Sequence, residues 1–138
     1  MRSTSSAADR WGARRERGAT VVEFLGVMLL ATVALMVLMQ AALWIWARNV
    51  TVNAADEGAR VAAESGRPLG DGVARVRSVL HDGLGARGAG FAVEIAQDGD
   101  TVVVRARGRA PQIVPFLAPL DVSAEARAFD EDEALPGG

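Results

Sequence analysis

Residues 24–47 read FLGVMLLATVALMVLMQAALWIWA, a run of 24 residues without a charged side chain. A helix of this length spans roughly 36 Å at 1.5 Å per residue, which is enough to cross a hydrocarbon core of about 30 Å with some tilt. A chain of 138 residues has no core large enough to surround such a helix on every side. The run therefore predicts a transmembrane helix, which we place at residues 19–47, rather than a buried core helix.

The charges on either side of this run predict its orientation. Residues 1–18 carry five Arg and two acidic residues, residues 19–47 a single acid, and residues 48–138 ten Arg and 14 acids. Because basic residues that flank a span stay on the cytoplasmic side, we expect a single-pass protein of the cell (inner) membrane with a cytoplasmic N-terminus and an extracytoplasmic C-terminal domain. Trp44 and Trp46, at the far end of the run, are typical of the interface between the lipid bilayer and water.

The composition excludes several classes of site. The chain has no Cys and one His, which excludes a disulfide framework, Cys ligands and any site that needs two imidazoles. His81 and Asp82 are the only imidazole–carboxylate neighbours, and adjacent residues on a helix do not face each other as a catalytic dyad would. No phosphate-binding loop or metal-ligand spacing accompanies them. We therefore expect a protein that is not an enzyme, has no cofactor and, without a basic surplus, binds no nucleic acid.

Two removable export signals fit the N-terminal region poorly. A secretory signal peptide has an apolar region of about 7–15 residues followed by a small-residue cleavage site, whereas this run is longer and ends in Trp-Ile-Trp-Ala-Arg at residues 44–48. A twin-arginine signal is disfavoured because Glu16 and Arg17 follow the Arg14–Arg15 pair, where apolar residues are expected.

Glu23 lies immediately before the uncharged apolar run. A carboxylate inside a membrane segment costs a few kcal/mol unless it is near the interface, protonated or paired. Taken alone, Glu23 is most simply interpreted as an acid at the start of a helix, stabilised by the amide dipoles of the first turn.

The residues around Glu23 change this interpretation, because residues 14–24 read RRERGATVVEF. This segment resembles the class III signal of type IV pilins, in which a prepilin peptidase cuts after a Gly and a Glu is the fifth residue of the mature chain. The resemblance implies a basic leader at residues 1–18, cleavage between Gly18 and Ala19, and a role in subunit assembly for Glu23. Major pilins often begin with Phe, where this chain has Ala19.

The physical chemistry of Glu23 suits that role. Cleavage would remove the basic leader and create a new α-amino group beside the membrane. The Glu23 carboxylate of a neighbouring subunit could neutralise this amine, so that two costly charges become one pair in a medium of low dielectric constant. Such pairing favours docking at a defined axial register, which an assembling filament needs.

A second resemblance lies downstream of the membrane segment, where residues 53–63 read NAADEGARVAA. They resemble the A-x-E-G-A-R-x-A-A segment of TadE-like proteins, the small pilin-like proteins of tight-adherence (Flp-type, type IVb) pilus systems. The resemblance implies that this segment continues the transmembrane helix outward. The matching residues are Ala55, Glu57, Gly58, Ala59 and Arg60.

Residues 48–65 also make a plausible helix on their own, as the extracellular continuation of a helix that would run from about Ala19 to about Ser65. Opposite charges at i,i+4 spacing support it, in the pairs Asp56–Arg60 and Arg60–Glu64. A stripe of small and apolar residues would let another element approach closely, either within this subunit or between subunits, and the sequence leaves both possibilities open. The stripe comprises Val50, Ala54, Gly58, Val61 and Ala62.

Residues 66–129 predict a small α+β ectodomain with a second helix and a three-stranded antiparallel sheet. We expect the helix to start at an Asp71 N-cap, to end at Gly83 or Gly85, and to be followed by a Gly-rich loop as far as Gly90. We expect the first two strands to contain the alternating residues Phe91, Val93 and Ile95, and Val102, Val104 and Ala106. An Asp98-Gly99 turn would pair Ile95 with Val102 and Val93 with Val104.

In residues Val122–Phe129, side chains suited to a buried face alternate with mostly polar ones, which predicts a third strand. Residues 130–138 predict an acidic disordered tail. Two surfaces keep alternative interpretations. Arg105, Arg107 and Arg109 predict a solvated strand face, with Glu94 near enough to pair with Arg105. The alternative is a site that binds an anionic surface polymer or the acidic residues of another subunit. The apolar residues of the Pro-rich segment 111–119 would either cover the sheet or form an exposed contact patch.

The sequence thus predicts an α+β protein with a long N-terminal transmembrane helix of the pilin type. The resemblance implies a minor pilin or pseudopilin of a Tad pilus that acts in assembly and adherence. Its partners would be the prepilin peptidase, other Tad/Flp pilins and pseudopilins, the assembly platform with its ATPase, and the lipid bilayer. One alternative is a signal-anchored envelope protein, neither cleaved nor built into a pilus, whose ectodomain binds a surface partner. Another is a secreted adhesin that binds through residues 105–109.

Overall fold

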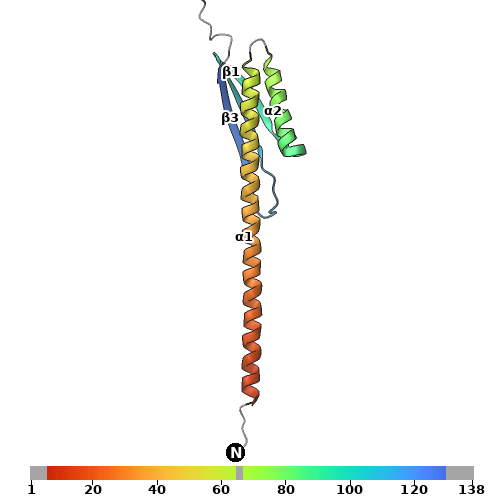
Figure 1. The fold of residues 1–138 in the computed structure, drawn as a ribbon, viewed down its shortest axis with the longest axis vertical. Coiled ribbons are helices and arrows are strands. Elements are labelled where there is room, and N and C mark those ends of the chain that lie inside the picture. Colours follow the sequence, from red (N-terminus) through yellow and green to blue (C-terminus); the bar gives the residue numbers. More distant parts are fainter. Residues whose placement is uncertain (1–5, 65–66, 130–138) are drawn as a thin grey trace, which may run out of the picture. The chain divides into compact units, whose positions relative to one another are not determined.

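The computed structural model describes residues 6–64 and 67–129, with side chains from residue 20 onward, and the predicted acidic tail lies outside the described residues (Figure 1). The elements are α1 (Ser6–Ala62), α2 (Leu69–Leu84), the 3₁₀-helix η1 (Gly85–Gly90), β1 (Ala92–Asp98), β2 (Thr101–Arg109) and β3 (Asp121–Phe129). The strands form one antiparallel sheet in the order β1-β2-β3. This confirms the predicted α+β class, with a long N-terminal helix, a second helix and a three-stranded sheet.

The chain divides into two units, residues 1–38 and residues 39–138. We call the described part of the first unit, residues 6–38, the anchor, and the described part of the second the body. The anchor is entirely helical. α1 begins at Ser6, earlier than the predicted start near Ala19, because residues 6–18 are rich in Ala and Arg, which favour helix.

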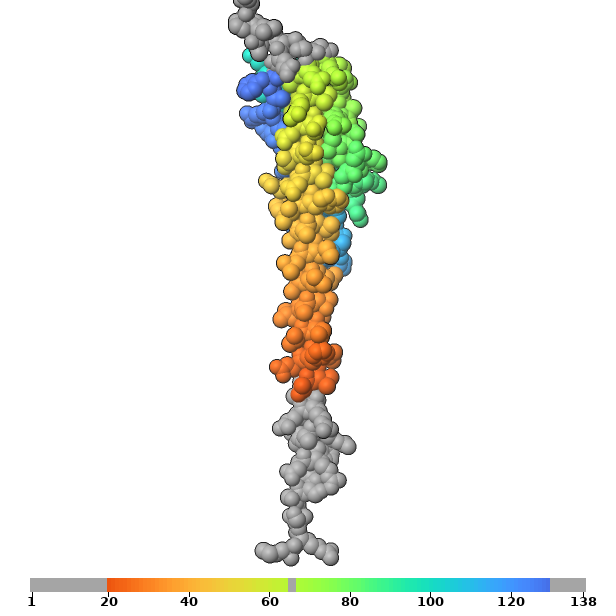
Figure 2. All heavy atoms as spheres, in the orientation of Figure 1, coloured from red at the N-terminus to blue at the C-terminus, as the bar shows by residue number. Residues whose placement is uncertain are grey.

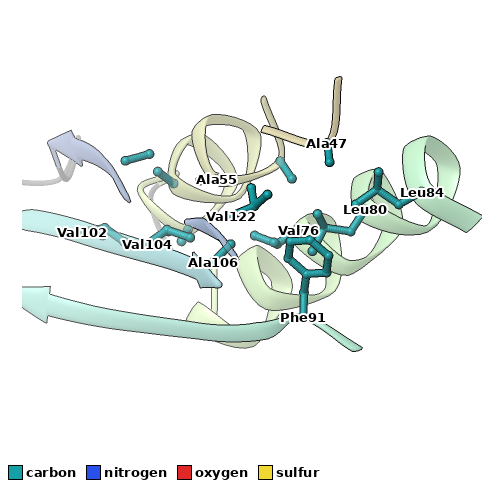
Figure 3. Packing of buried hydrophobic residues seen from close by; sticks show 14 of the residues in the cluster. Ala47, Ala55, Val76, Leu80, Leu84, Phe91, Val102, Val104, Ala106 and Val122 are labelled. Carbon is teal, nitrogen blue, oxygen red and sulfur yellow. The ribbon is translucent and has the colours of Figure 1, made fainter. Parts of the chain in front are cut away.

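The body is built around the segment of α1 that follows Leu38. Figure 2 shows α2 (green) lying along this segment (yellow) on one side and β3 (blue) on the other. α1 contributes mainly alanines to the core, whereas α2 and the sheet contribute larger apolar side chains, as Figure 3 shows. The buried members include Ala47, Ala54, Ala55, Ala59, Val76, Leu80, Val102, Val104 and Val122.

The stripe of small residues on α1 packs within the subunit. Ala54, Gly58 and Ala62 of the stripe are buried, while Val50 and Val61 are half-buried. At Gly58 an added Cβ would overlap the Val76 side chain and lie 3.1 Å from the carbonyl oxygen of Gly72. A Cβ on Gly72 would lie 2.8 Å from the carbonyl oxygen of Gly58. The two glycines therefore let α1 and α2 come into backbone contact.

The ends of α2 differ from the prediction. The helix begins at Leu69 with Pro68 as N-cap, because the fixed φ of proline suits a helix start, and Asp71 lies in the first turn instead of capping it. Gly85 ends the helix, with φ +61° and its N–H donating to the His81 carbonyl. Gly83 lies inside the helix, where a Cβ would come 2.5 Å from Val50. The segment that follows is the 3₁₀-helix η1 and not an irregular loop.

The predicted strands are confirmed, but the predicted register of the hairpin is wrong by two residues. Ile95 pairs with Val104 and Val93 with Ala106. The turn residues are Gly99, with φ +59°, and Asp100, whose φ is not positive. The predicted Asp98-Gly99 turn would need positive φ at both residues, a cost that glycine alone avoids. Because the shift is even, each side chain keeps its predicted face.

Candidate functional site

The residues that the sequence associates with processing and assembly lie on α1. Gly18 and Ala19 are within the helix, and the Glu23 side chain is exposed. Among the described residues, α1 contains the one helix long and apolar enough to cross a membrane, from Thr20 to Ala62. The apolar window of this helix is not buried inside the protein at all, so its hydrophobic surface needs a covering that the fold does not supply.

The side chains of the anchor are suited to lipid. From residue 20 to residue 38 all of them except Met36 are exposed, including Phe24 at 58% and Leu30 at 70%. The hydroxyl of Thr32 donates to the Met28 carbonyl at 2.9 Å, so this polar group needs no water. A large exposed apolar surface of this kind is typical of a membrane or partner contact.

Gln40 is the second polar residue of the uncharged run, and sequence reasoning did not single it out. Its side chain is buried and makes two hydrogen bonds to the segment between β2 and β3. Nε2 donates to the Pro111 carbonyl at 2.9 Å, and Oε1 accepts from the Ile113 N–H at 2.9 Å. Gln40 therefore fastens the β2–β3 connection to α1. A lone amide in an apolar run was the signal available in the sequence, since a buried amide must find partners.

The two tryptophans predicted at the membrane interface have different surroundings. Trp44 is half-buried, packs against the core and donates its indole N–H to the Asp121 carbonyl at 3.1 Å. Trp46 is 46% exposed. Both lie in the body, together with buried Ala47, so the last turns of the uncharged run contact protein as well as presenting apolar surface.

The motif at residues 55–60 divides between core and surface. Ala55, Gly58 and Ala59 are buried against α2 and the sheet. Glu57 accepts from Arg75 of α2 at 3.4 Å, and Arg60 is exposed. The small residues of the motif thus provide close packing inside the subunit.

The ion pairs predicted along this part of α1 are replaced by others. Arg60 was expected to pair with Asp56 and Glu64, but within the described ranges Glu64 pairs with Arg67 at 2.7 Å. The chain turns after Ala62, where α1 ends, and this brings Arg67 within reach of Glu64.

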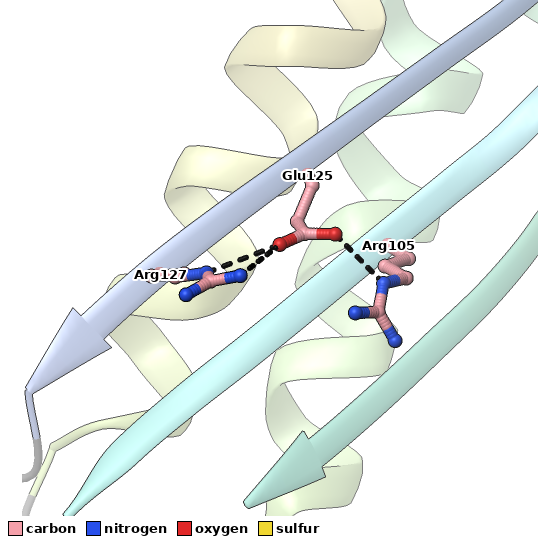
Figure 4. Close-up of polar contacts among 3 residues, drawn as sticks. All are labelled: Arg105, Glu125 and Arg127. Carbon is pink, nitrogen blue, oxygen red and sulfur yellow. Dashed lines mark hydrogen bonds and ion pairs between the residues drawn. The ribbon is translucent and has the colours of Figure 1, made fainter. Parts of the chain in front are cut away.

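The outer face of the sheet carries a charged cluster rather than a row of isolated arginines. Figure 4 shows Glu125 of β3 between Arg105 of β2 and Arg127, with N···O distances of 2.8 Å to each. The hydrogen bond from Arg105, followed by that from Arg127, lowers the pKa of Glu125. The partner of Arg105 is therefore Glu125 and not the predicted Glu94, which contributes only a weaker charge interaction.

The segment between β2 and β3 is both packed and exposed. Val114 is fully buried, whereas Ile113, Phe116 and Leu117 are 45%, 72% and 36% exposed. Among the four large apolar residues of the segment, Val114 therefore packs into the body and the other three form surface.

His81 and Asp82, the only imidazole–carboxylate neighbours in the sequence, are both exposed on α2. Within residues 20–64 and 67–129, where side chains are described, no group of three or more His, Asp or Glu side chains could hold a metal ion. The features with evident physical consequence are the exposed apolar helix, the exposed Glu23 and the glycine contact between α1 and α2.

Three comparisons with known proteins gave one match. No curated protein and no solved structure matches the chain. A family model described as TadE-like protein matches residues 18–60, a range that includes Gly18, Glu23, the uncharged run and the motif up to Arg60. The resemblance inferred from the sequence is thereby confirmed: residues 18–60 of this chain are similar to the TadE-like family.

Proposed function

We propose that this chain is a minor pilin or pseudopilin of a Tad (Flp-type) type IVb pilus. It enters the membrane with its N-terminus in the cytoplasm, is cut between Gly18 and Ala19 by a prepilin peptidase, and takes part in pilus assembly and adherence. The observation that carries the proposal is the TadE-like match over residues 18–60, because it joins the Gly18–Glu23 spacing to an exposed apolar helix.

Glu23 is the residue on which assembly depends. Its side chain is exposed at the start of the apolar segment, where a carboxylate without a partner is costly in lipid. The α-amino group of Ala19 in a neighbouring subunit supplies the opposite charge once the leader has been removed. Pairing is therefore possible only after cleavage, which couples processing to docking.

Other partners follow from the same pathway. An assembly platform in the membrane extracts the mature subunit, an ATPase drives extraction through the platform, and other pilins and pseudopilins receive it. The packed body argues for a minor component, since major Flp pilins are much shorter. The exposed arginines of the sheet do not favour a separate adhesin role, because Arg105 already pairs with Glu125.

The proposal is tested by the intact mass and N-terminal sequence of the membrane-extracted protein, from cells with and without the prepilin peptidase. We expect a chain that starts at Ala19 only when the peptidase is present. Gly18→Leu is expected to abolish this cleavage. Gly26→Leu is the matched control, because Gly26 lies on the same helix with nothing within 4 Å of an added Cβ.

A second measurement separates assembly from processing. Glu23→Gln is expected to be cleaved normally but to be lost from sheared pilus fractions. An uncleaved wild-type chain in both strains, together with unchanged behaviour of Glu23→Gln, would instead identify a permanent signal anchor, whose function would lie in the ectodomain.

A further inference from the structure

The connection between β2 and β3, residues 110–120, presents apolar side chains to the outside. It contains no charged residue, and Phe116 at 72% exposure is among the most exposed large apolar residues of the body. We call Ile113, Phe116 and Leu117 the Phe116 patch. Exposed large apolar side chains grouped within five residues are typical of a contact surface.

The backbone under the Phe116 patch is held by hydrogen bonds. Gln40 binds both the Pro111 carbonyl and the Ile113 N–H. The Gln112 side chain donates to the carbonyls of Val114 and Leu117, and the Leu117 N–H donates to the Val114 carbonyl at 3.2 Å. The patch is therefore presented by a fixed turn, which limits the entropy that a contact would cost.

The place of the patch in the chain indicates what covers it. Gln40 is the second residue of the second unit, whose first residue is Met39, so the connection is fastened to the first turn of α1 within the body. Figure 1 shows the connection running along α1 at the end of the body away from the α1–α2 turn. Trp46, also exposed, lies less than two helical turns after Gln40.

A groove with basic walls adjoins the connection. It has a volume of about 1030 Å³, and its lining includes Arg87, Arg107 and Arg109 together with residues 110–112 of the connection. Among the described residues, only Arg109 of these three has an ion pair, a long one of 3.8 Å to Asp121. We call this the arginine groove.

The two ends of the sheet differ in charge. β2 starts beside the hairpin turn, which carries Asp98 and Asp100, and ends beside the connection at Arg107 and Arg109, where Asp121 of β3 is the one acid opposite them. The basic end of the body is therefore the end that contains Gln40, at the start of the body's part of α1. Apolar side chains flanked by arginines suit a membrane surface with anionic lipids, because the apolar groups enter among the headgroups while the cations bind phosphate.

We propose that this end of the body docks on the anionic lipid surface of the membrane that the anchor crosses. The Phe116 patch inserts among the headgroups, and the arginine groove binds lipid phosphates. This proposal rests on the proposed function in one respect only, namely that the anchor spans a bilayer. Docking would hold the body at a fixed depth at the membrane surface.

Spin labels on single cysteines test the proposal cleanly, since the chain has no Cys. The full chain is reconstituted at low density in vesicles of phosphatidylcholine alone or with added phosphatidylglycerol. Labels are placed at Phe116→Cys, at Ser78→Cys on the exposed face of α2 and at Leu30→Cys in the anchor. Their collision rates are measured with oxygen, which partitions into lipid, and with a nickel chelate, which stays in water.

We expect the Phe116 label to lose collisions with nickel and gain collisions with oxygen when phosphatidylglycerol is present, and to revert in 1 M salt. The Ser78 label is expected to remain in water throughout. Arg87→Ser with Arg107→Ser is expected to abolish the shift. The matched pair Arg60→Ser with Arg127→Ser removes the same charge elsewhere and is expected to preserve it.

Leu30 separates the two proposals. A Leu30 label in lipid with a Phe116 label in water would overturn docking and leave the membrane anchor intact. A Leu30 label in water would overturn the membrane anchor, and docking with it. Protection of Phe116 accompanied by dipolar broadening between labels, relieved by dilution with unlabelled chains, would show that a second copy covers the patch and would also overturn docking on lipid.

Discussion

Single glycines decide how closely the two helices of the body can approach. Gly58 is part of the motif shared with TadE-like proteins, and its neighbour across the contact is Gly72. The physical role of the motif glycine is thus visible inside one subunit. Because Gly58 has no side chain, the backbone of α1 can contact the backbone of α2. A side chain at this position would keep the two backbones further apart.

We expect Gly58→Ala to destabilise the body by about 1–3 kcal/mol, the usual cost of overpacking a tight contact. The added methyl would overlap Val76 and face the Gly72 carbonyl oxygen at 3.1 Å. We expect this loss of stability even though Ala is favoured over Gly in a helix by roughly 1 kcal/mol. The measurement is urea unfolding of the detergent-solubilised full chain, followed by circular dichroism.

Gly70→Ala is the matched control for this substitution. Gly70 also lies on α2, but nothing is within 4 Å of an added Cβ, so we expect unchanged or slightly increased stability. Equal stability of the two variants would show that the α1–α2 contact is looser than the structure indicates.

At the scale of elements, the sheet is joined on its outer face by Glu125. This carboxylate of β3 links Arg105 of β2 and Arg127 through hydrogen bonds. Its pKa is lowered in the folded state, whereas in the unfolded chain it returns to an ordinary value of about 4.3. The stabilisation is therefore fully present above that value and is lost as the pH falls through the lowered folded pKa.

We expect Glu125→Gln to reduce the loss of stability below about pH 4.3, because that variant has no carboxylate to protonate at this position. We also expect Arg105→Gln to raise the pKa of Glu125 toward its ordinary value, as followed by NMR titration of the side-chain carboxyl carbon. Glu94→Gln is the control, since Glu94 faces Arg105 without accepting its hydrogen bond. Identical acid-unfolding profiles for wild type and Glu125→Gln would refute the role of this pair.

One helix, α1, serves two environments. Between residues 24 and 38 it carries Leu, Met, Val and Phe on an exposed surface, and between residues 47 and 62 it carries Ala and Gly against protein. Large apolar residues are suited to lipid, whereas small ones are suited to close contact with another element. The change of residue size along the sequence therefore marks the change of surroundings.

At the scale of the whole molecule, the asymmetry of charge predicts how the chain is oriented in its membrane. With the leader retained in cells that lack the prepilin peptidase, we expect Ser3→Cys to be shielded from a membrane-impermeant maleimide until the cells are permeabilised. Ser78→Cys is expected to react in intact spheroplasts. The physical reason is that the arginines of residues 1–18 resist translocation. If Ser3→Cys but not Ser78→Cys were labelled in intact spheroplasts, the N-terminus would lie outside the membrane and the predicted orientation would be wrong.

The sequence by itself determined the apolar helix, the α+β class, the three strands with their inward and outward faces, and the TadE-like segment. These follow from uncharged runs, alternation and short motifs, which are properties of neighbouring residues. The start of the first helix at Ser6 could not be predicted in the same way. The composition of residues 6–18 is compatible both with a basic leader and with a helix.

Only the tertiary structure decided the two-residue shift of the hairpin, which depends on which of two adjacent positions takes positive φ. It also decided that Glu125 and not Glu94 binds Arg105, since both carboxylates flank the same strand. The attachment of Gln40 to residues 111–113 was likewise beyond the sequence. That contact joins positions more than 70 residues apart, and only the path of the chain between them brings a buried amide to the backbone groups that satisfy it.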